Sequence, residues 1–463
     1  MQEYTERLGY APLGRLLLRL SLPGIASTVT ASLYNVVDTF WVARLGHEAI
    51  AALTIVFPYQ ILFVAVAVGT GIGITSLVSR RFGERNLEAT HHIAGQIFFL
   101  SVGIGLIFIL AAVLFSEQIL VAIGATPDIL DFADQYLVII AYGAPMIIFA
   151  MISGQLIRGS GDAVKPMIIM ISASVLNIVL DPLMILGIGP FPEMDIRGAA
   201  WATVIAQSLG AAIALFYLLA HRTAYTIRAK HLLPDLSVLK DIYRVGAPSM
   251  ILELTESFAF VLFNIVVSAF GSVAIAAVGL VIRISDLAFM PIIGVSNGLL
   301  PIIGYNFGAR LFHRLWKATV IASLGIAALL AVATVVIEVL APQVIGIFSQ
   351  EQELMKTTIP AIRILLSTLI FIGPTIMFIT VFQGLSRGAM ALVLSLIRQF
   401  LLFIPLLYLF RYIWGLYGIW WSLPVSDVLS FLVTFLIIYR EYGKHKKAGY
   451  LEAQTSPAGS IPS

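Results

Sequence analysis

Long apolar stretches separated by short polar segments dominate the chain. A helix needs about 20 apolar residues to cross the hydrocarbon core of a bilayer, and twelve windows of that kind occur. They cover roughly 15–42, 49–78, 92–116, 130–157, 165–187, 198–220, 240–269, 273–303, 316–341, 357–383, 389–411 and 416–439. Many contain proline or glycine, which membrane helices tolerate because neighbouring helices or local water satisfy the freed backbone groups. The pattern predicts an all-α polytopic membrane protein with twelve transmembrane helices.

Composition supports a membrane protein. Of the 463 residues, 59% are hydrophobic and only 11% are charged, whereas soluble domains carry about 25% charged residues. Most of the surface must therefore face lipid, and no polar stretch is long enough for a soluble domain. There is no cysteine, which excludes disulfides, thiol catalysis and cysteine metal sites. The first apolar stretch runs from Leu13 past Trp41 and is too long for a signal peptide, so we interpret it as the first span.

Basic residues predict the orientation. If both termini are cytoplasmic, the cytoplasmic segments hold 21 of the 28 lysines and arginines, the outer loops hold four, and the spans hold three. The positive-inside rule then predicts a multi-pass protein of the cytoplasmic (inner) membrane with both termini in the cytoplasm. The same rule accounts for the net charge of +3, so no nucleic-acid partner is expected.

The sequence repeats itself at an offset of about 225 residues. Matched positions include Pro23 with Pro248, Gly46 with Gly271, and Arg85 with Arg310. Each copy has six predicted helices, and an even number gives both copies the same topology. The two six-helix lobes are therefore expected to be related by a pseudo-twofold axis along the membrane normal. Transporters with parallel repeats bind substrate between the halves and alternate access by rocking them.

The repeat also suggests a domain division. We expect an N-terminal six-helix lobe at 1–221, a cytoplasmic linker at 222–244 and a C-terminal six-helix lobe at 245–440. The remaining segment, 441–463, is polar towards its end and is expected to be a disordered cytoplasmic tail.

Polar residues inside the first lobe suggest an ion-coupling site. Asp38, Asp181 and Thr203 lie at similar predicted depths, roughly 8–12 Å below the outer end of their helices, and Asn177 is one turn from Asp181. Ionisable groups within spans are costly, so they are functional candidates by default. Two carboxylates, a carboxamide and a hydroxyl can bind Na⁺ or hold a shared proton. Alternatively, each carboxylate pairs with an arginine or caps a broken helix, although no basic residue is near in sequence.

Tyr34 is the candidate for lining a central cavity, because it precedes Asp38 by four residues and shares its face. A packing role is equally compatible with the pattern. The histidines lack metal-binding spacing, and no P-loop, nucleophile elbow or kinase motif occurs, which argues against an ATP-driven pump and against an enzyme.

The acidic residues of the second lobe are compatible with several roles. Glu253 and Glu256 lie three residues apart on one helix, and Glu256 could meet a cationic substrate, carry a second proton, or pair with Arg283 or Arg398. Asp286 follows Arg283 by three residues, which favours a local ion pair. For Asp427, which follows Pro424, the sequence does not choose between roles.

Three motifs resemble those of the MATE (multidrug and toxic compound extrusion) transporters, and the resemblance covers about residues 10–440. They are Tyr34-Asn35-Val-Val-Asp38-Thr-Phe-Trp-Val-Ala-Arg-Leu-Gly46, Asn177-Ile-Val-Leu-Asp181-Pro182 and Gly198-Ala-Ala-Trp-Ala-Thr203. The resemblance implies a twelve-helix fold with a V-shaped pair of lobes. It also implies export of amphipathic, often cationic, drugs by antiport with Na⁺ or H⁺, without any cofactor besides the coupling cation.

The cation-site residues follow from the same resemblance. Asp38, Asn177, Asp181 and Thr203 match the family's first-lobe cation site and would be metal ligands only if the coupling ion is Na⁺. Tyr34, Asn35 and Glu256 are the expected substrate-binding residues. The expected partners are a small amphipathic substrate and membrane lipid, and the chain is expected to be a monomer.

One difference from the NorM-like branch of the family suggests which branch the chain resembles. Glu256 falls eight residues after Pro248, where the NorM-like branch carries a glutamate, but the tenth span has no acid. The chain therefore resembles the DinF-like branch more closely, with coupling concentrated in the first lobe. A lipid-linked oligosaccharide or lipid flippase of the same superfamily is the main alternative, and a membrane-embedded enzyme and a channel are remote ones.

Overall fold

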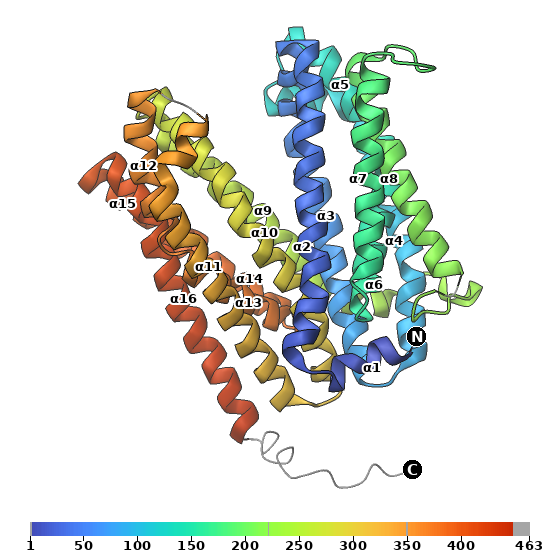
Figure 1. The fold of residues 1–463 in the computed structure, drawn as a ribbon. Coiled ribbons are helices and arrows are strands. Elements are labelled where there is room, and N and C mark those ends of the chain that lie inside the picture. The colour runs from blue at the N-terminus through green and yellow to red at the C-terminus, as the bar shows by residue number, and fades with distance from the viewer. Residues whose placement is uncertain (1, 221, 349–350, 448–463) are drawn as a thin grey trace, which may run out of the picture. The chain divides into compact units, whose positions relative to one another are not determined.

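The computed structural model describes residues 2–220, 222–348 and 351–447, which form helices joined by short connections (Figure 1). The first half contains α1 (Gln2–Tyr10), α2 (Leu13–Val42), α3 (His47–Gly83), α4 (Leu87–Ile123), α5 (Pro127–Tyr142), α6 (Ala144–Gly159), α7 (Val164–Ile185) and α8 (Asp195–Leu219). The second half contains α9 (Leu236–Ser268), α10 (Ser272–Gly308), α11 (Phe312–Phe348), α12 (Gln352–Leu366), α13 (Leu369–Gly384), α14 (Gly388–Leu396), α15 (Ile404–Trp414) and α16 (Leu416–Lys447). A π-helical segment, Ile397–Phe403, joins α14 to α15.

Ten spans are long and apolar enough to cross a membrane, and two bent helix pairs bring the total to as many as twelve within the described residues. The pairs are α5 with α6, bent by 52°, and α12 with α13, bent by 44°. Every window identified in the sequence corresponds to one of these spans or pairs, so the all-α class is confirmed. The first bend follows from local chemistry, because Gly143 ends α5 and Pro145, which lacks a backbone N–H, lies in the first turn of α6.

Contacts divide the chain into two compact units. The first comprises 1–7 and 23–250, and the second comprises 8–22 and 251–463. The chain crosses between the units twice within a helix. One crossing is at Pro23 in α2, and the other is just after Met250 in α9, two residues beyond Pro248. Pro23 therefore marks the point at which α2 passes from one unit to the other, and the matched Pro248 lies two residues before the corresponding point in α9. The lobe limits expected from the repeat, 1–221 and 245–440, stay a prediction.

The connection between α8 and α9 is fixed to α4 in the first unit. Gln96 is fully buried, and its Nε2 donates hydrogen bonds to the carbonyl oxygens of His231 (3.1 Å) and Leu233 (2.8 Å), while its Oε1 accepts one from Asp235 N (3.0 Å). Gly95 lets this backbone approach, because a Cβ there would lie 2.0 Å from the His231 carbonyl oxygen. The expected linker is thus a packed part of the fold where these bonds hold it.

Asp235 also begins α9. Its Oδ1 accepts hydrogen bonds from the backbone N–H groups of Ser237 (2.8 Å) and Val238 (3.3 Å), as an N-cap side chain does. These donors hold the pKa of Asp235 below its usual range.

At the other end of the second half, α16 continues to Lys447, past residue 441 where the sequence predicts a disordered tail. The rest of that tail, 448–463, lies outside the described residues.

We expect Gly95→Ala to destabilise the protein by about 1–3 kcal/mol, because the added methyl group must displace the connection at His231. Gly103→Ala, on the same helix, is the matched control. No atom lies within 4 Å of its added Cβ, so the gain in helix propensity should leave stability unchanged or raise it by up to about 1 kcal/mol. Thermal unfolding of the purified variants in detergent measures both effects, and equal unfolding temperatures would contradict the close packing at Gly95.

Candidate functional site

A polar cluster lies inside the first unit, where α7 packs against α8. Asn177 and Asp181 are one turn apart on α7, and Thr203 projects from α8. Asn177 Nδ2 donates a hydrogen bond to Asp181 Oδ1 (3.2 Å) and another to Thr203 Oγ1 (3.3 Å). The helices meet closely because Gly198 lacks a side chain: a Cβ there would lie 2.5 Å from the Met184 carbonyl oxygen. Three of the four predicted coupling residues are thus joined by direct hydrogen bonds.

Asp38 brings the fourth side chain from α2. Its charge acts on the carboxylate of Asp181 and on the hydroxyl group of Tyr34, so the carboxylates of both helices share one electrostatic environment. Within the described part of the chain, no basic group offsets the charge of either carboxylate. The alternative that each one simply pairs with an arginine therefore does not hold there.

Several oxygen atoms of this cluster have no hydrogen-bond donor. Asp38 Oδ1, Asn177 Oδ1 and Asp181 Oδ2 are buried and unpaired among the described residues. A buried polar atom left in this way costs about 1–3 kcal/mol, so such atoms call for an explanation. Carboxylate and amide oxygens are the ligands that hard cations prefer. The donor set therefore fits Na⁺, and the paired carboxylates equally fit a bound proton.

The cluster is not a multi-acid metal centre. No group of three or more His, Cys, Asp or Glu side chains that could hold a metal ion occurs in residues 2–220, 222–348 and 351–447. With two carboxylates and neutral oxygens, the site offers little negative charge and no nitrogen or sulfur ligand. That composition suits a weakly bound monovalent cation better than a transition metal.

Two neighbours of the cluster were missed by sequence reasoning. Tyr136, a buried residue of α5, lies close enough to feel the charges of Asp38 and Asp181. Its hydroxyl oxygen accepts a hydrogen bond from Gln60 Nε2 of α3 (3.4 Å). A tyrosine within an apolar helix carries no distinguishing signal in sequence, because the same residue also serves at membrane interfaces. Only the packing of α2, α3, α5 and α7 reveals its place.

The expected substrate-binding residues occupy three different environments. Tyr34 is half-buried beside Asp38, whereas Asn35, on the next position of α2, is exposed. Glu256 belongs to the second unit, on α9, where its side chain is also exposed. Glu253 lies one turn before it and close enough for the two carboxylates to interact.

The second unit neutralises its buried aspartate internally. Arg398 Nε lies 3.0 Å from Asp427 Oδ1, and the two side chains are 15% and 2% exposed. Ser426 Oγ donates a hydrogen bond to the carbonyl oxygen of Arg398 (3.1 Å), which the π-helical segment carries. Asp427 is therefore the partner of Arg398, and Glu256 lies close enough to feel the same guanidinium. The ion pair expected between Arg283 and Asp286 does not form among the described residues, and both side chains are exposed.

Asp427→Asn should lower the stability of the protein by about 3–5 kcal/mol, because the buried Arg398 guanidinium loses the one carboxylate that is ion-paired with it among the described residues. Replacing both residues, as Arg398→Met with Asp427→Leu, should recover most of the loss. Asp286→Asn is the control, since that acid is exposed. The unfolding temperature in detergent reports all three, and a stable Asp427→Asn variant would show that the pair is not structural.

Comparison with known sequences gives a consistent result. The model of the MatE family matches residues 23–183 and again residues 248–409. The first match starts at Pro23, where the structure divides α2, and the second starts at Pro248, two residues before the division of α9. Each match therefore covers most of one copy of the internal repeat.

Known transporters match the chain over nearly its whole length. An FAD transporter from Shewanella oneidensis is 28% identical over 441 residues, which cover 93% of this chain and 95% of the relative. The multidrug export protein MepA from Staphylococcus aureus is 25% identical, covering 94% of this chain and 96% of the relative. Among solved structures, that of a MOP superfamily transporter from Pyrococcus furiosus has a TM-score of 0.89 and 28% identity, and the match covers 95% of this chain and 98% of the other.

Proposed function

Because the chain belongs to the MatE family of transporters, we propose that it exports amphipathic, often cationic, small molecules in exchange for Na⁺ or H⁺. MepA, which the chain matches over nearly its whole length, is a multidrug export protein. The buried, unpaired oxygens around Asp38 and Asp181 carry the coupling part of the proposal. Among the described residues of the first unit, no other cluster of buried carboxylates lacks a positively charged partner.

Four residues hold the coupling cation in this proposal. If it is Na⁺, the oxygens of Asp38, Asn177, Asp181 and Thr203 are its ligands. If it is H⁺, the carboxyl groups of Asp38 and Asp181 carry it, and Asn177 keeps its hydrogen bond to Asp181 in either case. A bound cation supplies the positive charge that the cluster lacks, which lowers the cost of keeping two carboxylates within the membrane.

Coupling to transport then follows from the position of Asp38 on α2. Asp38 and Asp181 repel each other when both are charged, so their separation depends on whether that charge is neutralised. A shift of Asp38 changes the packing of the outer part of α2, and Pro23 is where the helix can bend, because proline interrupts its hydrogen-bond ladder. Since α2 passes from the first unit to the second at this residue, the bend links the cation site to both units.

The identity of the cargo is the least constrained part. Tyr34 and Asn35 of α2 and Glu256 of α9 are the proposed substrate contacts, and the carboxylate of Glu256 favours cations. The Shewanella relative, however, is an FAD transporter, so a flavin nucleotide is the second cargo to test. We further propose a DinF-like monomer in the cytoplasmic membrane with both termini in the cytoplasm, and with lipid as its surrounding partner.

Asp38→Asn and Asp181→Asn should each reduce cation-driven efflux of ethidium by at least about tenfold, because a neutral amide cannot exchange the coupling charge. The control is Glu117→Gln, which removes an exposed acid from α4 and should leave efflux unchanged. Efflux is measured in everted vesicles containing equal amounts of each variant. Full efflux by both aspartate variants would exclude this site from coupling.

Vesicles with an imposed Na⁺ gradient, an imposed pH gradient or neither should distinguish the coupling ion. We expect dye or flavin to move with one gradient only and to stop when that gradient is collapsed by an ionophore. Variants at Asp38 should lose the response to that same gradient. Transport that continues with both gradients collapsed would contradict secondary active exchange, and transport of lipid-linked oligosaccharide but of neither dye nor flavin would favour a flippase.

A further inference from the structure

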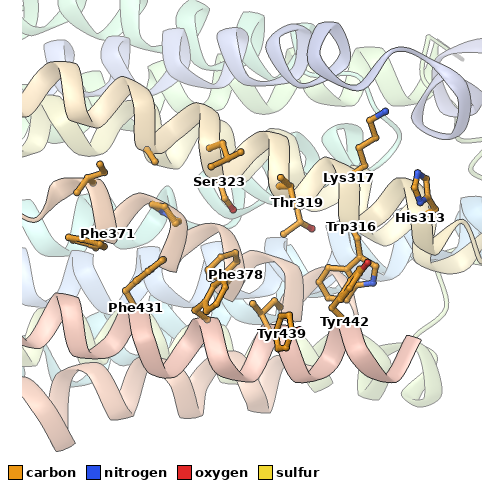
Figure 2. A pocket seen from close by; sticks show the side chains of 17 residues that line it. His313, Trp316, Lys317, Thr319, Ser323, Phe371, Phe378, Phe431, Tyr439 and Tyr442 are labelled. Carbon is orange, nitrogen blue, oxygen red and sulfur yellow. The ribbon is translucent and has the colours of Figure 1, made fainter. Parts of the chain in front are cut away.

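A long groove opens on the surface of the second unit, over α13 and between α11 and α16 (Figure 2). Both flanking helices pack on α13, and the groove has a volume of about 770 Å³. Its walls are almost wholly apolar and aromatic, and they include Leu324, Phe371, Phe378, Phe431 and Phe435. Every lining residue belongs to the second unit, so the groove is a feature of that unit alone.

The groove has a polar end and an apolar end. His313, Trp316, Lys317 and Tyr442 line the end nearest the start of α11, whereas phenylalanines line the other, as Figure 2 shows. Along α11 the lining extends from residue 313 to residue 327, about 21 Å at a rise of 1.5 Å per residue. A bilayer measures about 40–45 Å with its headgroup regions, so the groove is about as long as one leaflet is thick.

Two buried polar groups in this lining have no partner. Trp316 is 6% exposed and Ser323 is 7% exposed, yet the indole Nε1–H of the first and the hydroxyl group of the second form no hydrogen bond with the described residues. These polar side chains lie beneath the floor of the groove near its polar end. Both lie on α11, seven residues and therefore about two turns apart.

The charge at the polar end is positive. Lys317 is exposed and forms no salt bridge in the part of the chain that the structure describes. Glu441, a buried acid near the end of α16, is bound to Arg387 (2.5 Å) and Lys444 (3.2 Å). The acid of this region is therefore already paired, and the ammonium group of Lys317 remains to attract an anion.

We propose that this groove binds one anionic phospholipid. The positive end of the groove lies on the predicted cytoplasmic side, so the lipid belongs to the cytoplasmic leaflet. One acyl chain lies over α13 among the phenylalanines, and the lipid phosphate lies at Lys317. The exposed side chains of Lys317 and Val320 on α11 contact the lipid, and the buried Trp316 and Ser323 lie beneath it. Tryptophan and tyrosine at one end also suit the headgroup level of a membrane.

The lipid fits these features better than a transported drug does. The groove matches the length and polarity of a leaflet, and its exposed rim, with Val320 at 54% and Leu324 at 66%, is the apolar surface that a membrane protein turns to lipid. A bound chain would fill the space between α11 and α16 and so brace both against α13. This binding is independent of the cation cluster, which lies in the other unit.

The headgroup contact is tested by native mass spectrometry of the purified protein after incubation with equal amounts of phosphatidylglycerol and phosphatidylcholine. Wild-type protein should retain phosphatidylglycerol preferentially. Lys317→Gln should reduce that preference about fivefold, which corresponds to the ~1 kcal/mol that one lysine contributes near an anionic surface. Lys240→Gln, which removes an exposed lysine at the start of α9, should not change it. Equal effects of the two substitutions would overturn the headgroup assignment.

The acyl-chain contact is tested by filling the groove. Val320→Trp should abolish retention of both lipids, whereas Val332→Trp should retain them as wild type does. The two valines lie on the same helix and are 54% and 63% exposed, but only Val320 lines the groove. Unchanged retention in Val320→Trp would overturn the proposal. A dimer mass that disappears in that variant would also overturn it, because the occupant would then be a second chain. Displacement of the lipid by ethidium would do the same, because the occupant would then be the cargo.

Discussion

The cost of keeping charge away from water governs this structure. Hydrocarbon offers no hydrogen bonds and little dielectric screening, so each ionisable side chain within a span needs a partner or an exchangeable ion. The second unit neutralises its buried Asp427 with the Arg398 guanidinium, which is held 3.0 Å away. Among the described residues, Asp38 and Asp181 of the first unit have no basic partner. A permanent ion pair fixes one conformation, whereas an exchangeable cation allows two, which is what a coupled transporter needs.

The number and type of the helices could be predicted because hydrocarbon thickness sets the length of an apolar run. Even the broken pairs α5 with α6 and α12 with α13 appeared as single windows, since a bend does not interrupt the apolar pattern. Helix ends were less accurate: α3 and α10 both continue beyond the predicted limits. Polar residues at a helix end fall outside the apolar window although the backbone there remains helical. Hydropathy therefore underestimates the length of such helices.

The candidate site was predictable in part. Asn177 and Asp181 share a turn of α7, and their depth relative to Thr203 follows from counting residues to the loops, so three members could be placed together. Tyr136 and Gln60 could not, because their position depends on how α3 and α5 pack. The pairing of Arg398 with Asp427 was equally hidden. These residues are separated along the chain, and the π-helical segment that carries Arg398 changes the direction in which its side chain projects.

The two helices that belong to both units have a consequence for the origin of the protein. Residues 8–22, which include the start of α2, belong to the second unit, and the start of α9, up to residue 250, belongs to the first. The beginning of each copy is thus contributed to the other copy, which is a reciprocal exchange. A single-copy ancestor with this fold would be complete only as a dimer that traded the first turns of its opening helix. Gene fusion would then have joined a partnership that already existed, and it would have freed the acids of the two copies to diverge.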